Sequence, residues 1–430
     1  MLKLGTAWRD VTPDRPLDLM GQMHIRKGQF ARDPLTVNAA WFEQNGRRLV
    51  LLSVDICVLT NSLVRRIREA IAQTGLLSPQ ELFIAATHTH VAPVVPDAGI
   101  LPGEVDEPWI EQLIRGIVET IQAAAADVEP VTLWSGDGQV DLGWNRRGYH
   151  RDGSVDMYHG SWKPDFSGIE GPRDTHIGVI WATREDRSIK LITFSFASHC
   201  NALSSGNFYS ADLPGEVRKV LRYALGEKTG VLYFTGAAGD IDTVVMENNP
   251  ANAQPWRGEQ GIKSAGGYLG GEILRVIAST FKPMANQEIA STRRTFSAAT
   301  RVWDAHFDPE KLAPGGMRDY CVTSRNDWDR LLREEPESVI EVAAVRLGDG
   351  VICFNPAELY CQFGLAIKSA SPAKTTVVAQ LAHGTCGYIP TPQAILHGGY
   401  SARSSNHTRC APDTGWRIVD HTAELLKELF

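Results

Sequence analysis

The chain switches repeatedly between two hydrophobic periodicities, one typical of buried strands and one typical of amphipathic helices. Short β-branched apolar runs, such as RRLVLLSVDICVL at 47–59 and ELFIAATHTH at 81–90, predict strands. The stretch NSLVRRIREAIAQTG at 61–75 has apolar residues at helical spacing, with Asn61 as the expected N-cap and Gly75 as the stop. This mixture predicts an α/β (mixed α+β) fold, in which mixed β-sheets are flanked by helices.

The same alternation continues to the C-terminus. Residues 107–128 predict a long helix, 177–184 and 189–199 predict a pair of strands, and 339–358 predict a hairpin. Neither a tandem repeat nor a low-complexity linker is visible in the sequence. We therefore expect residues 1–430 to form a single domain.

Three long polar segments interrupt the pattern, at 142–173, 244–264 and 386–415. Structureless loops of this length inside a compact domain are usually functional or disordered. Because these segments contain Trp, Tyr, His and Arg, we expect them to be ordered loops over a functional site.

Composition excludes several classes of partner. Apolar residues make up 43% of the chain and charged residues 22%, which is ordinary for a globular protein. The net charge is -7 and no basic stripe occurs, so nucleic acid is not an expected partner. The longest apolar runs are far shorter than the ~20 residues of a membrane span, and no amphipathic membrane-binding stretch is visible. We expect a small-molecule substrate and no stable membrane association.

The N-terminus and the cysteines suggest a compartment. The opening stretch MLKLGTAWRDVTPD has neither a long apolar core nor a small-residue cleavage site, so a signal peptide is not expected. The seven cysteines are scattered and lack a CxxC pair. A reduced, cytoplasmic protein with buried thiols is the simplest interpretation.

Candidate chemistry gathers where predicted strands end. His88 and His90 lie two residues apart in ATHTHVAP (86–93), so on an extended strand both face the same side. The pair alone is also typical of two histidines hydrogen-bonded at a strand end. However, His199 and Glu358 end two other apolar runs. Imidazole and carboxylate are the ligands of a catalytic zinc with an open position, and such a zinc lowers the pKa of its water toward ~7.

Further motifs run along the chain in a fixed order. They are GTAWRDVTP (5–13), MGQMHIRKGQFARD (20–33), ATHTHVAP (86–93), NRRGY (145–149), FASHCNAL (196–203), SADLPGEV (210–217), FTGAAGDID (234–242), FNPAELYCQFG (354–364) and GYIPTPQAILHGGY (387–400). In order and spacing this set resembles the catalytic domain of the neutral (non-lysosomal) ceramidases, which are zinc amidases. The resemblance implies a zinc-hydrolase catalytic domain over the whole chain.

The resemblance also implies a ligand set for Zn²⁺. The first histidine of the HTH motif corresponds to His88, and the histidine of the FATH-like motif corresponds to His199. The glutamate of the PGE-like motif corresponds to Glu358, and the tyrosine of the GY motif to Tyr388. A neutral phenol binds metal weakly, so the role of Tyr388 rests on the position of its motif alone.

Three other residues are implied to surround the substrate carbonyl: His90, Arg146 and Tyr400. A tetrahedral oxyanion needs donors that are already aimed at it. Arg146 offers a permanent cation with a planar fork of donors, Tyr400 a phenolic donor, and His90 a proton shuttle near neutral pH. The alternative structural roles are a surface salt bridge for Arg146, packing for Tyr400 and hydrogen bonding at the strand end for His90.

The chain departs from the family pattern at GDIDTV (239–244), where ceramidases have GD-x-S-P-N. Asp242 takes the position of the serine, which lies close to the substrate in the family. Asp242 is therefore a candidate to repel an anion, to bind an amine or to act as a base, and an Asx-type turn is its structural alternative. Asp240 is expected to orient the loop or a histidine.

The second departure is length. The larger ceramidases are exported and add a C-terminal immunoglobulin-like domain, which we do not expect in this chain. The expectation is therefore a smaller or more polar N-acyl substrate rather than ceramide.

The leading hypothesis is a zinc-dependent amidase in which zinc-bound hydroxide attacks the carbonyl and His90 or Asp242 passes a proton to the amine. An ester or lactone hydrolase, a metal-assisted lyase on a sugar-like substrate, and a non-catalytic binding protein are the alternatives. A structural zinc is disfavoured because such sites are usually cysteine-rich.

Overall fold

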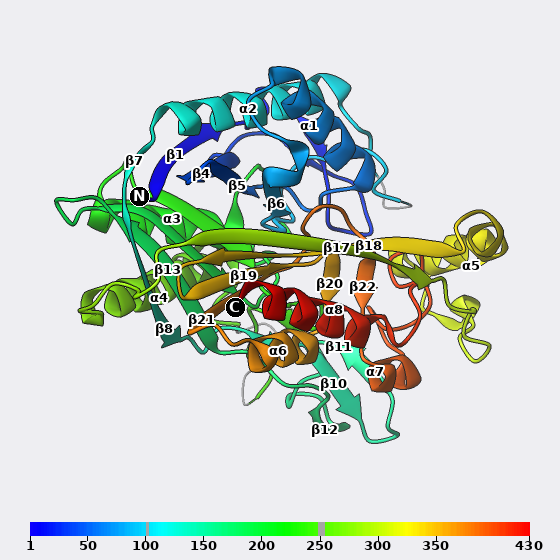
Figure 1. Ribbon diagram of the computed structural model, residues 1–430. Coiled ribbons are helices and arrows are strands. Elements are labelled where there is room, and N and C mark those ends of the chain that lie inside the picture. Colours follow the sequence, from blue (N-terminus) through cyan, green and yellow to red (C-terminus); the bar gives the residue numbers. More distant parts are fainter. Residues whose placement is uncertain (100–102, 248–253) are drawn as a thin grey trace.

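The computed structural model describes residues 1–99, 103–247 and 254–430. Within these ranges, three larger sheets share one apolar core, and helices cover the outer face of each sheet (Figure 1). The core takes side chains from all three sheets, for example Leu51, Phe234 and Val377. The predicted fold class, mixed sheets flanked by helices, is confirmed.

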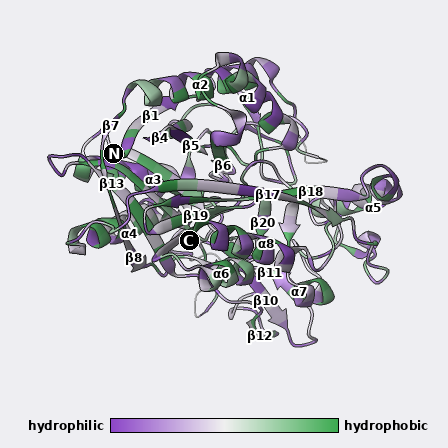
Figure 2. Cartoon of the chain, viewed as in Figure 1, coloured by the Kyte–Doolittle hydropathy of each residue, from purple (hydrophilic) through white to green (hydrophobic). Residues whose placement is uncertain are grey.

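The first sheet has the strand order β6-β5-β4-β1-β7. These strands are Leu82–Ala86, Arg47–Val54, Thr36–Gln44, Lys3–Asp10 and Glu129–Pro130. Only β5 and β6 run parallel, and α1 (Asn61–Thr74) connects them. α2 (Glu107–Ala126) follows β6 and packs beside α1. Both helices have polar and apolar residues (Figure 2) and bury the apolar face.

The other two sheets have the orders β15-β14-β13-β8 and β21-β19-β18-β17. The strands of the second are Gly230–Thr235, Ile189–Phe196, His176–Thr183 and Thr132–Gln139, and those of the third are Thr375–Ala379, Gly350–Phe354, Glu337–Leu347 and Ile289–Ala299. The covering helices are α3 (Asp212–Leu225) and α4 (Gly258–Ser279) on the second sheet, and α6 (Cys361–Ala370) and α8 (Thr414–Leu429) on the third.

These three sheets are built from one repeated unit. In each unit three strands pair antiparallel, a helix crosses over to a fourth strand that pairs parallel with the third, and a second helix follows. The sequence shows no such repeat, because the units share topology and differ in almost every side chain. The carboxyl ends of the third and fourth strands therefore lie at corresponding places in all three units.

The fourth strands, β6, β15 and β21, meet one another at their carboxyl ends. Ala86 N donates to Leu381 O at 3.2 Å, and Gln380 N donates to Thr235 O at 2.9 Å. The Thr235 hydroxyl donates to Thr87 O at 2.8 Å and completes the ring of contacts. Because no outer strand separates them, the loops after these strands converge on one place.

Each unit also has an insertion between its first and second strands. The first insertion contains β2 (Leu17–Leu19) and β3 (Arg26–Gly28), and the third contains η2 (Pro309–Lys311) and α5 (Gly316–Glu334). The second contains β9 (Trp144–Asn145), β10 (Arg147–His150), β11 (Val155–Met157) and β12 (Phe166–Ile169). The remaining short elements are η1 (Pro79–Glu81), β16 (Ile241–Asp242), β20 (Ala357–Leu359), β22 (Gly387–Ile389) and α7 (Pro392–His397).

Several boundaries differ from the sequence prediction. Strand β5 ends at Val54 rather than at residue 59, and the N-cap of α1 is Thr60, whose hydroxyl accepts from Leu63 N, rather than Asn61. Gly75 ends the helix as predicted, with a left-handed φ of 66°. Of the predicted polar segment 244–264, residues 248–253 lie outside the described residues. Among the helices described, none is long and apolar enough to cross a membrane.

A buried ion pair joins the first unit to the second. The guanidinium of Arg218 on α3 donates to both carboxylate oxygens of Asp55, at 2.6 and 3.0 Å. Asp55 also accepts from the backbone and hydroxyl of Thr36 and from the hydroxyl of Thr87. Both charges are almost fully buried, so loss of one partner leaves the other without solvent or counter-charge.

We predict that Asp55→Asn lowers the free energy of unfolding by about 3–5 kcal/mol, because Arg218 then stays buried and unpaired. Urea denaturation followed by tryptophan fluorescence measures the change. Asp141→Asn is the matched control, since Asp141 pairs with Arg173 at the surface and its loss is expected to cost less than about 1 kcal/mol. Equal losses in the two variants would contradict the role given to the buried pair.

Candidate metal centre and substrate cavity

The predicted metal ligands come from loops at the same end of the three units, with His199 and Glu358 after a third strand and His88 after a fourth. His199 is the third residue after β14, and Glu358 follows β19 by four residues, on β20. His88 is the second residue after β6. It lies beyond the strand rather than on it, with a left-handed φ of 67° that is uncommon for a residue other than glycine. The prediction of an extended HTH strand end is therefore wrong, and tertiary contacts set the ring directions.

Three side chains converge on one point. The Nε2 atoms of His88 and His199 lie 3.4 and 3.2 Å from the same Glu358 oxygen, Oε2. One ligand atom from each of the three residues lies within 4.8 Å of the others, and all three side chains are buried. Such spacing suits a single cation held between two imidazoles and a carboxylate.

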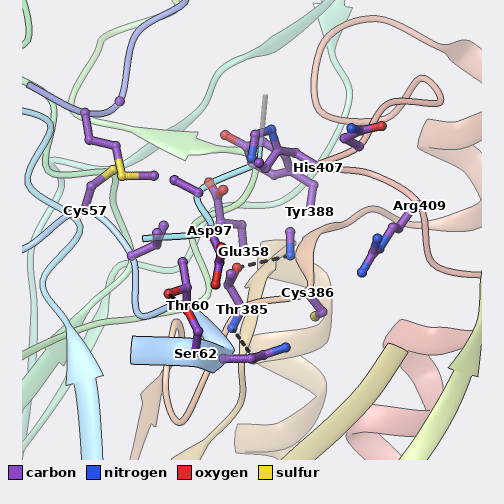
Figure 3. Close-up of a pocket in the computed structure, with 18 of the residues that line it drawn as sticks. Cys57, Thr60, Ser62, Asp97, Glu358, Thr385, Cys386, Tyr388, His407 and Arg409 are labelled. Carbon is purple, nitrogen blue, oxygen red and sulfur yellow. Dashed lines mark hydrogen bonds between the residues drawn. The ribbon is translucent and has the colours of Figure 1, made fainter. Parts of the chain in front are cut away.

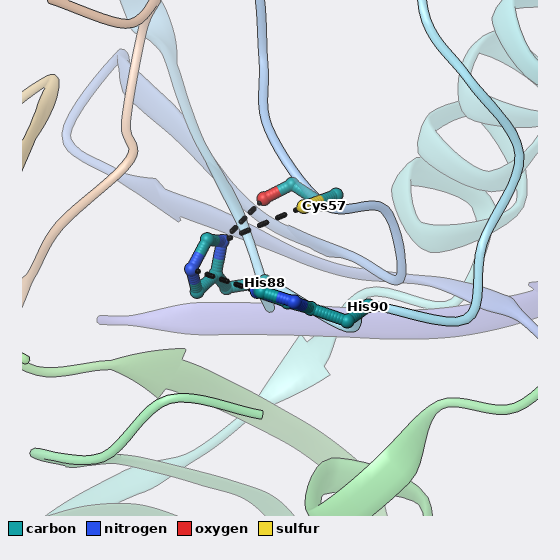
Figure 4. A group of neighbouring side chains, drawn as sticks. All are labelled: Cys57, His88 and His90. Carbon is teal, nitrogen blue, oxygen red and sulfur yellow. Dashed lines mark hydrogen bonds between the residues drawn. The ribbon is translucent and has the colours of Figure 1, made fainter. Parts of the chain in front are cut away.

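Backbone carbonyls fix the direction of both rings. The Nδ1 of His88 lies 2.8 Å from Cys57 O (Figure 4), and the Nδ1 of His199 lies 2.7 Å from Ala238 O. A ring that donates its Nδ1–H to a carbonyl presents the lone pair of Nε2 on the other side. The two Nε2 atoms and a carboxylate oxygen thus face one another, which requires positive charge among them, whether as a proton on His88, the Arg146 guanidinium or a bound cation.

The pKa shifts of these residues also indicate that positive charge is favoured beside Glu358. Glu358 Oε2 is buried and has no hydrogen-bond partner. Burial alone would lower the pKa of His88, but Cys57 and Glu358 outweigh it and raise that pKa to about 10. Burial and the Arg146 guanidinium lower the pKa of His199 to about 4, and the two imidazoles hold the Glu358 pKa well below its ordinary value despite burial. These residues fit a divalent cation by donor type, ring tautomer and charge.

Tyr388 is placed directly opposite Glu358. The two residues are register partners in the parallel pair of β20 and β22. The Tyr388 hydroxyl lies 3.3 Å from His199 Nε2. Burial, followed by Glu358 and Tyr400, raises the Tyr388 pKa well above its ordinary value, so the phenol is neutral. The structure thus brings Tyr388 to the cluster as a polar oxygen.

His90 lies against the same cluster, with its Nε2 3.3 Å from His88 Nε2. Burial and the neighbouring imidazoles of His88 and His199 hold its pKa well below the ordinary value, so the ring is neutral. A Cβ at Gly21 of the first insertion would lie only 2.6 Å from the His90 ring, which explains the glycine there. The His90 Nδ1 has no hydrogen-bond partner among the residues described.

Arg146 comes from the second insertion and is buried. Its Nη2 donates to Gly239 O at 3.0 Å and lies 3.1 Å from His199 Nε2 and 3.3 Å from the Tyr388 hydroxyl. Its Nη1 lies 3.6 Å from Asp242 Oδ2. The surface salt bridge considered for Arg146 is therefore not what the structure shows.

Asp242 is enclosed by donors. It accepts from the Tyr158 hydroxyl, from Asn201 Nδ2 at 3.1 Å and from Arg257 Nη1 at 3.2 Å. Burial alone would raise its pKa, but the Arg257 and Arg146 guanidiniums lower it far below the ordinary range. Tyr158 and Arg257 were missed in the sequence, and the one available signal was that both lie in the long polar segments.

The other two candidates lie farther from the cluster. Asp240 accepts from Cys361 N at 2.7 Å and Asn145 Nδ2 at 2.6 Å, and burial raises its pKa to about 6. It orients its loop and touches neither histidine ligand. The rings of Tyr400 and Tyr388 stand edge to face with centroids 5.7 Å apart. Burial and Glu358 raise the Tyr400 pKa to about 12, so this phenol also keeps its proton.

A cavity of about 600 Å³ opens onto the cluster (Figure 3). His88, His90, Glu358, Tyr388 and Tyr400 line its inner end. Its outer part includes charged side chains from three separate segments, namely Asp97, Asp327, Arg330, Glu335 and Arg409. The predicted polar segment 386–415 thus reaches the cavity, and so does α5 of the third insertion, which sequence reasoning did not identify.

Comparisons with known proteins agree with this architecture. No known family profile matches the sequence, and no curated protein sequence matches it either. Among solved structures, the neutral ceramidase from Pseudomonas aeruginosa superposes with a TM-score of 0.76 at 16% sequence identity, covering 100% of this chain and 74% of that one. A structure described as ceramidase complexed with C2 superposes with a TM-score of 0.77 at 16% sequence identity. That match covers 100% of this chain and 75% of the other. The chain therefore has the fold of the neutral ceramidases over its whole length.

Proposed function

We propose that this chain is a zinc-dependent hydrolase that cleaves the amide bond of a small or polar N-acyl substrate. The observation that carries the proposal is the convergence of two carbonyl-oriented imidazoles, His88 and His199, on the unpartnered oxygen of Glu358. Tyr388 is proposed as the fourth ligand, from its position opposite Glu358. The fold shared with amide-cleaving ceramidases supports the same reaction class.

A zinc ion at this position supplies a Lewis acid and lowers the pKa of a bound water toward ~7. The chain's own residues do the rest. Tyr400 lines the cavity, and buried Arg146 contacts Tyr388 behind that lining. We assign both the role of donating hydrogen bonds toward the carbonyl oxygen of the substrate, where charge develops. The Arg146 side chain is buried and the Tyr400 side chain is partly buried, so water competes little with the substrate for their hydrogen bonds.

His90 is the better candidate for proton transfer to the leaving amine. It is neutral and lines the cavity, and one ring nitrogen has no partner. Asp242 is less suited, because its oxygens are engaged by Tyr158, Asn201 and Arg257, and its pKa is too low for a base near neutral pH. We assign Asp242 the role of holding Arg146 in place.

The cavity favours a polar substrate. A ceramide has two long hydrocarbon chains, and burying them requires walls of apolar side chains. Here Asp327, Arg330 and Arg409 contribute charge to the outer wall. Desolvating these groups against a hydrocarbon chain is unfavourable, whereas a hydroxylated or charged amine forms hydrogen bonds with them.

We predict that His88→Ala loses one zinc per chain relative to wild type and has no measurable hydrolase activity. The reason is that only three of the four proposed ligands remain, and one of them is a neutral phenol that binds metal weakly. Plasma mass spectrometry on zinc-loaded, desalted protein measures the metal. His176→Ala, which removes a histidine paired with Asp137 near the surface, is expected to keep the wild-type content. An unchanged zinc content in His88→Ala would refute the proposed zinc site.

Tyr400→Phe is predicted to lower kcat/KM roughly 10²-fold while zinc content is unchanged, because one oxyanion donor is lost and no ligand. Steady-state kinetics and metal analysis on the same preparation test this. Tyr268→Phe, a change at a part-exposed tyrosine on α4, serves as control and should leave both values as in wild type. Loss of zinc together with activity in Tyr400→Phe would assign this tyrosine to the metal instead.

A substrate panel separates the remaining reactions. We expect kcat/KM for short N-acyl amines with hydroxyl or charged groups to exceed that for long-chain ceramide by about tenfold or more, since mismatched groups in a pocket cost that much. Esters and lactones with the same acyl groups test the hydrolase alternatives, and an unsaturated product would indicate a lyase. Preference for the long-chain ceramide would refute the assignment of a polar substrate.

A further inference from the structure

A second group of possible metal ligands lies in the second insertion, outside the candidate metal centre. Its members are His150 at the end of β10, His159, and Asp165 just before β12. One ligand atom from each lies within 4.8 Å of the others. Asp165 uses both carboxylate oxygens, with Oδ2 2.8 Å from His150 Nδ1 and Oδ1 3.0 Å from His159 Nε2.

The donor atoms are spaced almost as a metal would need them. Two ligands on a tetrahedral zinc with ~2.0–2.1 Å bonds lie about 3.3 Å apart, so the separations of 2.8 and 3.0 Å between Asp165 and the two imidazoles would open slightly around an ion. A second carboxylate, that of Asp156 on β11, lies 3.4 Å from the other nitrogen of His150. The two imidazole rings are in contact, with centroids 3.7 Å apart. The donor set, two imidazoles and a carboxylate, is one that zinc prefers.

His159 supplies an independent observation. Its side chain is more than nine-tenths buried, and its Nε2 points at the cluster without making a hydrogen bond. The half-exposed Asp165 carboxylate, 3.0 Å from Nε2 but outside hydrogen-bond geometry, compensates only part of the interaction with water that burial removes. A metal ion bound there would satisfy Nε2 and the Asp165 carboxylate together.

The insertion has little apolar core of its own and is held by polar contacts, such as those of buried Arg147 with Glu170 and Gly398 O. Within residues 144–173, all of which the structure describes, Val155 is the only apolar side chain that is buried. Its sheet consists of β10, β11 and β12, none longer than four residues. Small units without an apolar core commonly rely on a metal or a disulfide. No disulfide is formed by the cysteines of the chain.

We propose that His150, His159 and Asp165 form a second, structural zinc site that fixes the second insertion. This site is linked by neighbouring residues to the layer around the cavity. Tyr158 directly precedes His159, and it donates to Asp242, which faces Arg146. Tyr158 N also donates to Arg146 O. A metal at His159 therefore anchors the segment that holds Arg146 beside the candidate centre. This inference does not depend on the proposed function.

Zinc content per chain tests the proposal on the full-length protein after zinc loading and desalting. Wild type and His176→Ala are expected to hold two zinc ions, and His150→Ala and His88→Ala one each. Two zinc ions in His150→Ala, or a wild-type content of one that is lost in His88→Ala, would overturn the second site and leave the proposed function intact. A single ion lost in His150→Ala and kept in His88→Ala would support the second site and refute the proposed function.

A thermal measurement covers the case in which His150→Ala folds poorly. In the His88→Ala protein, only the second site remains, so added zinc should raise Tm. Asp165→Asn in the same background removes the carboxylate bridge and should abolish that shift. An equal zinc-induced rise in Tm with and without Asp165→Asn would indicate adventitious binding only and would contradict the site.

Discussion

The closure of three strand ends on one another is the constraint from which the rest of the structure follows. Strands β6, β15 and β21 each lie at an edge of their sheet, and hydrogen bonds from Ala86, Gln380 and Thr235 join their carboxyl ends. The loops after these strands and after their parallel neighbours β14 and β19 therefore lie around one centre, and they supply His88, His199 and Glu358. Three units with unrelated sequences thus place an imidazole, a second imidazole and a carboxylate within reach of one ion.

Charge balance then shapes the layer around that centre. Two guanidiniums, that of buried Arg146 and that of half-buried Arg257, flank Asp242, and this carboxylate in turn accepts from Tyr158. Neither Arg146 nor Asp242 would be tolerated alone at such depth, since an unpaired buried charge costs several kcal/mol. The aspartate at the position of the family serine is therefore understood together with Arg257. Each neutralises the other, and Asp242 also contacts Arg146, which lies against His199 and Tyr388.

The sequence supplied candidates for the site, whose roles stay predictions, but not their geometry. His88, His199 and Glu358 follow apolar runs, so local pattern made them candidates, and the resemblance separated His88 from His90. The resemblance added Tyr388, whose place opposite Glu358 depends on a parallel pair that no local pattern reveals. The left-handed backbone at His88 follows from a hydrogen bond to Ile56 O, a contact between distant segments. The repeated unit was invisible because topology recurs without shared side chains.

The insertions have a separate consequence for how such a protein changes over time. All three occur at the same point of the unit, between its first and second strands, and all three reach the cavity or the layer around it. The proposed ligands come from other loops, at the ends of the third and fourth strands. Under the proposed function, length and composition of the insertions can drift under selection for new substrates while the ligand loops stay untouched. The architecture would then separate the inheritance of a reaction from the inheritance of its specificity.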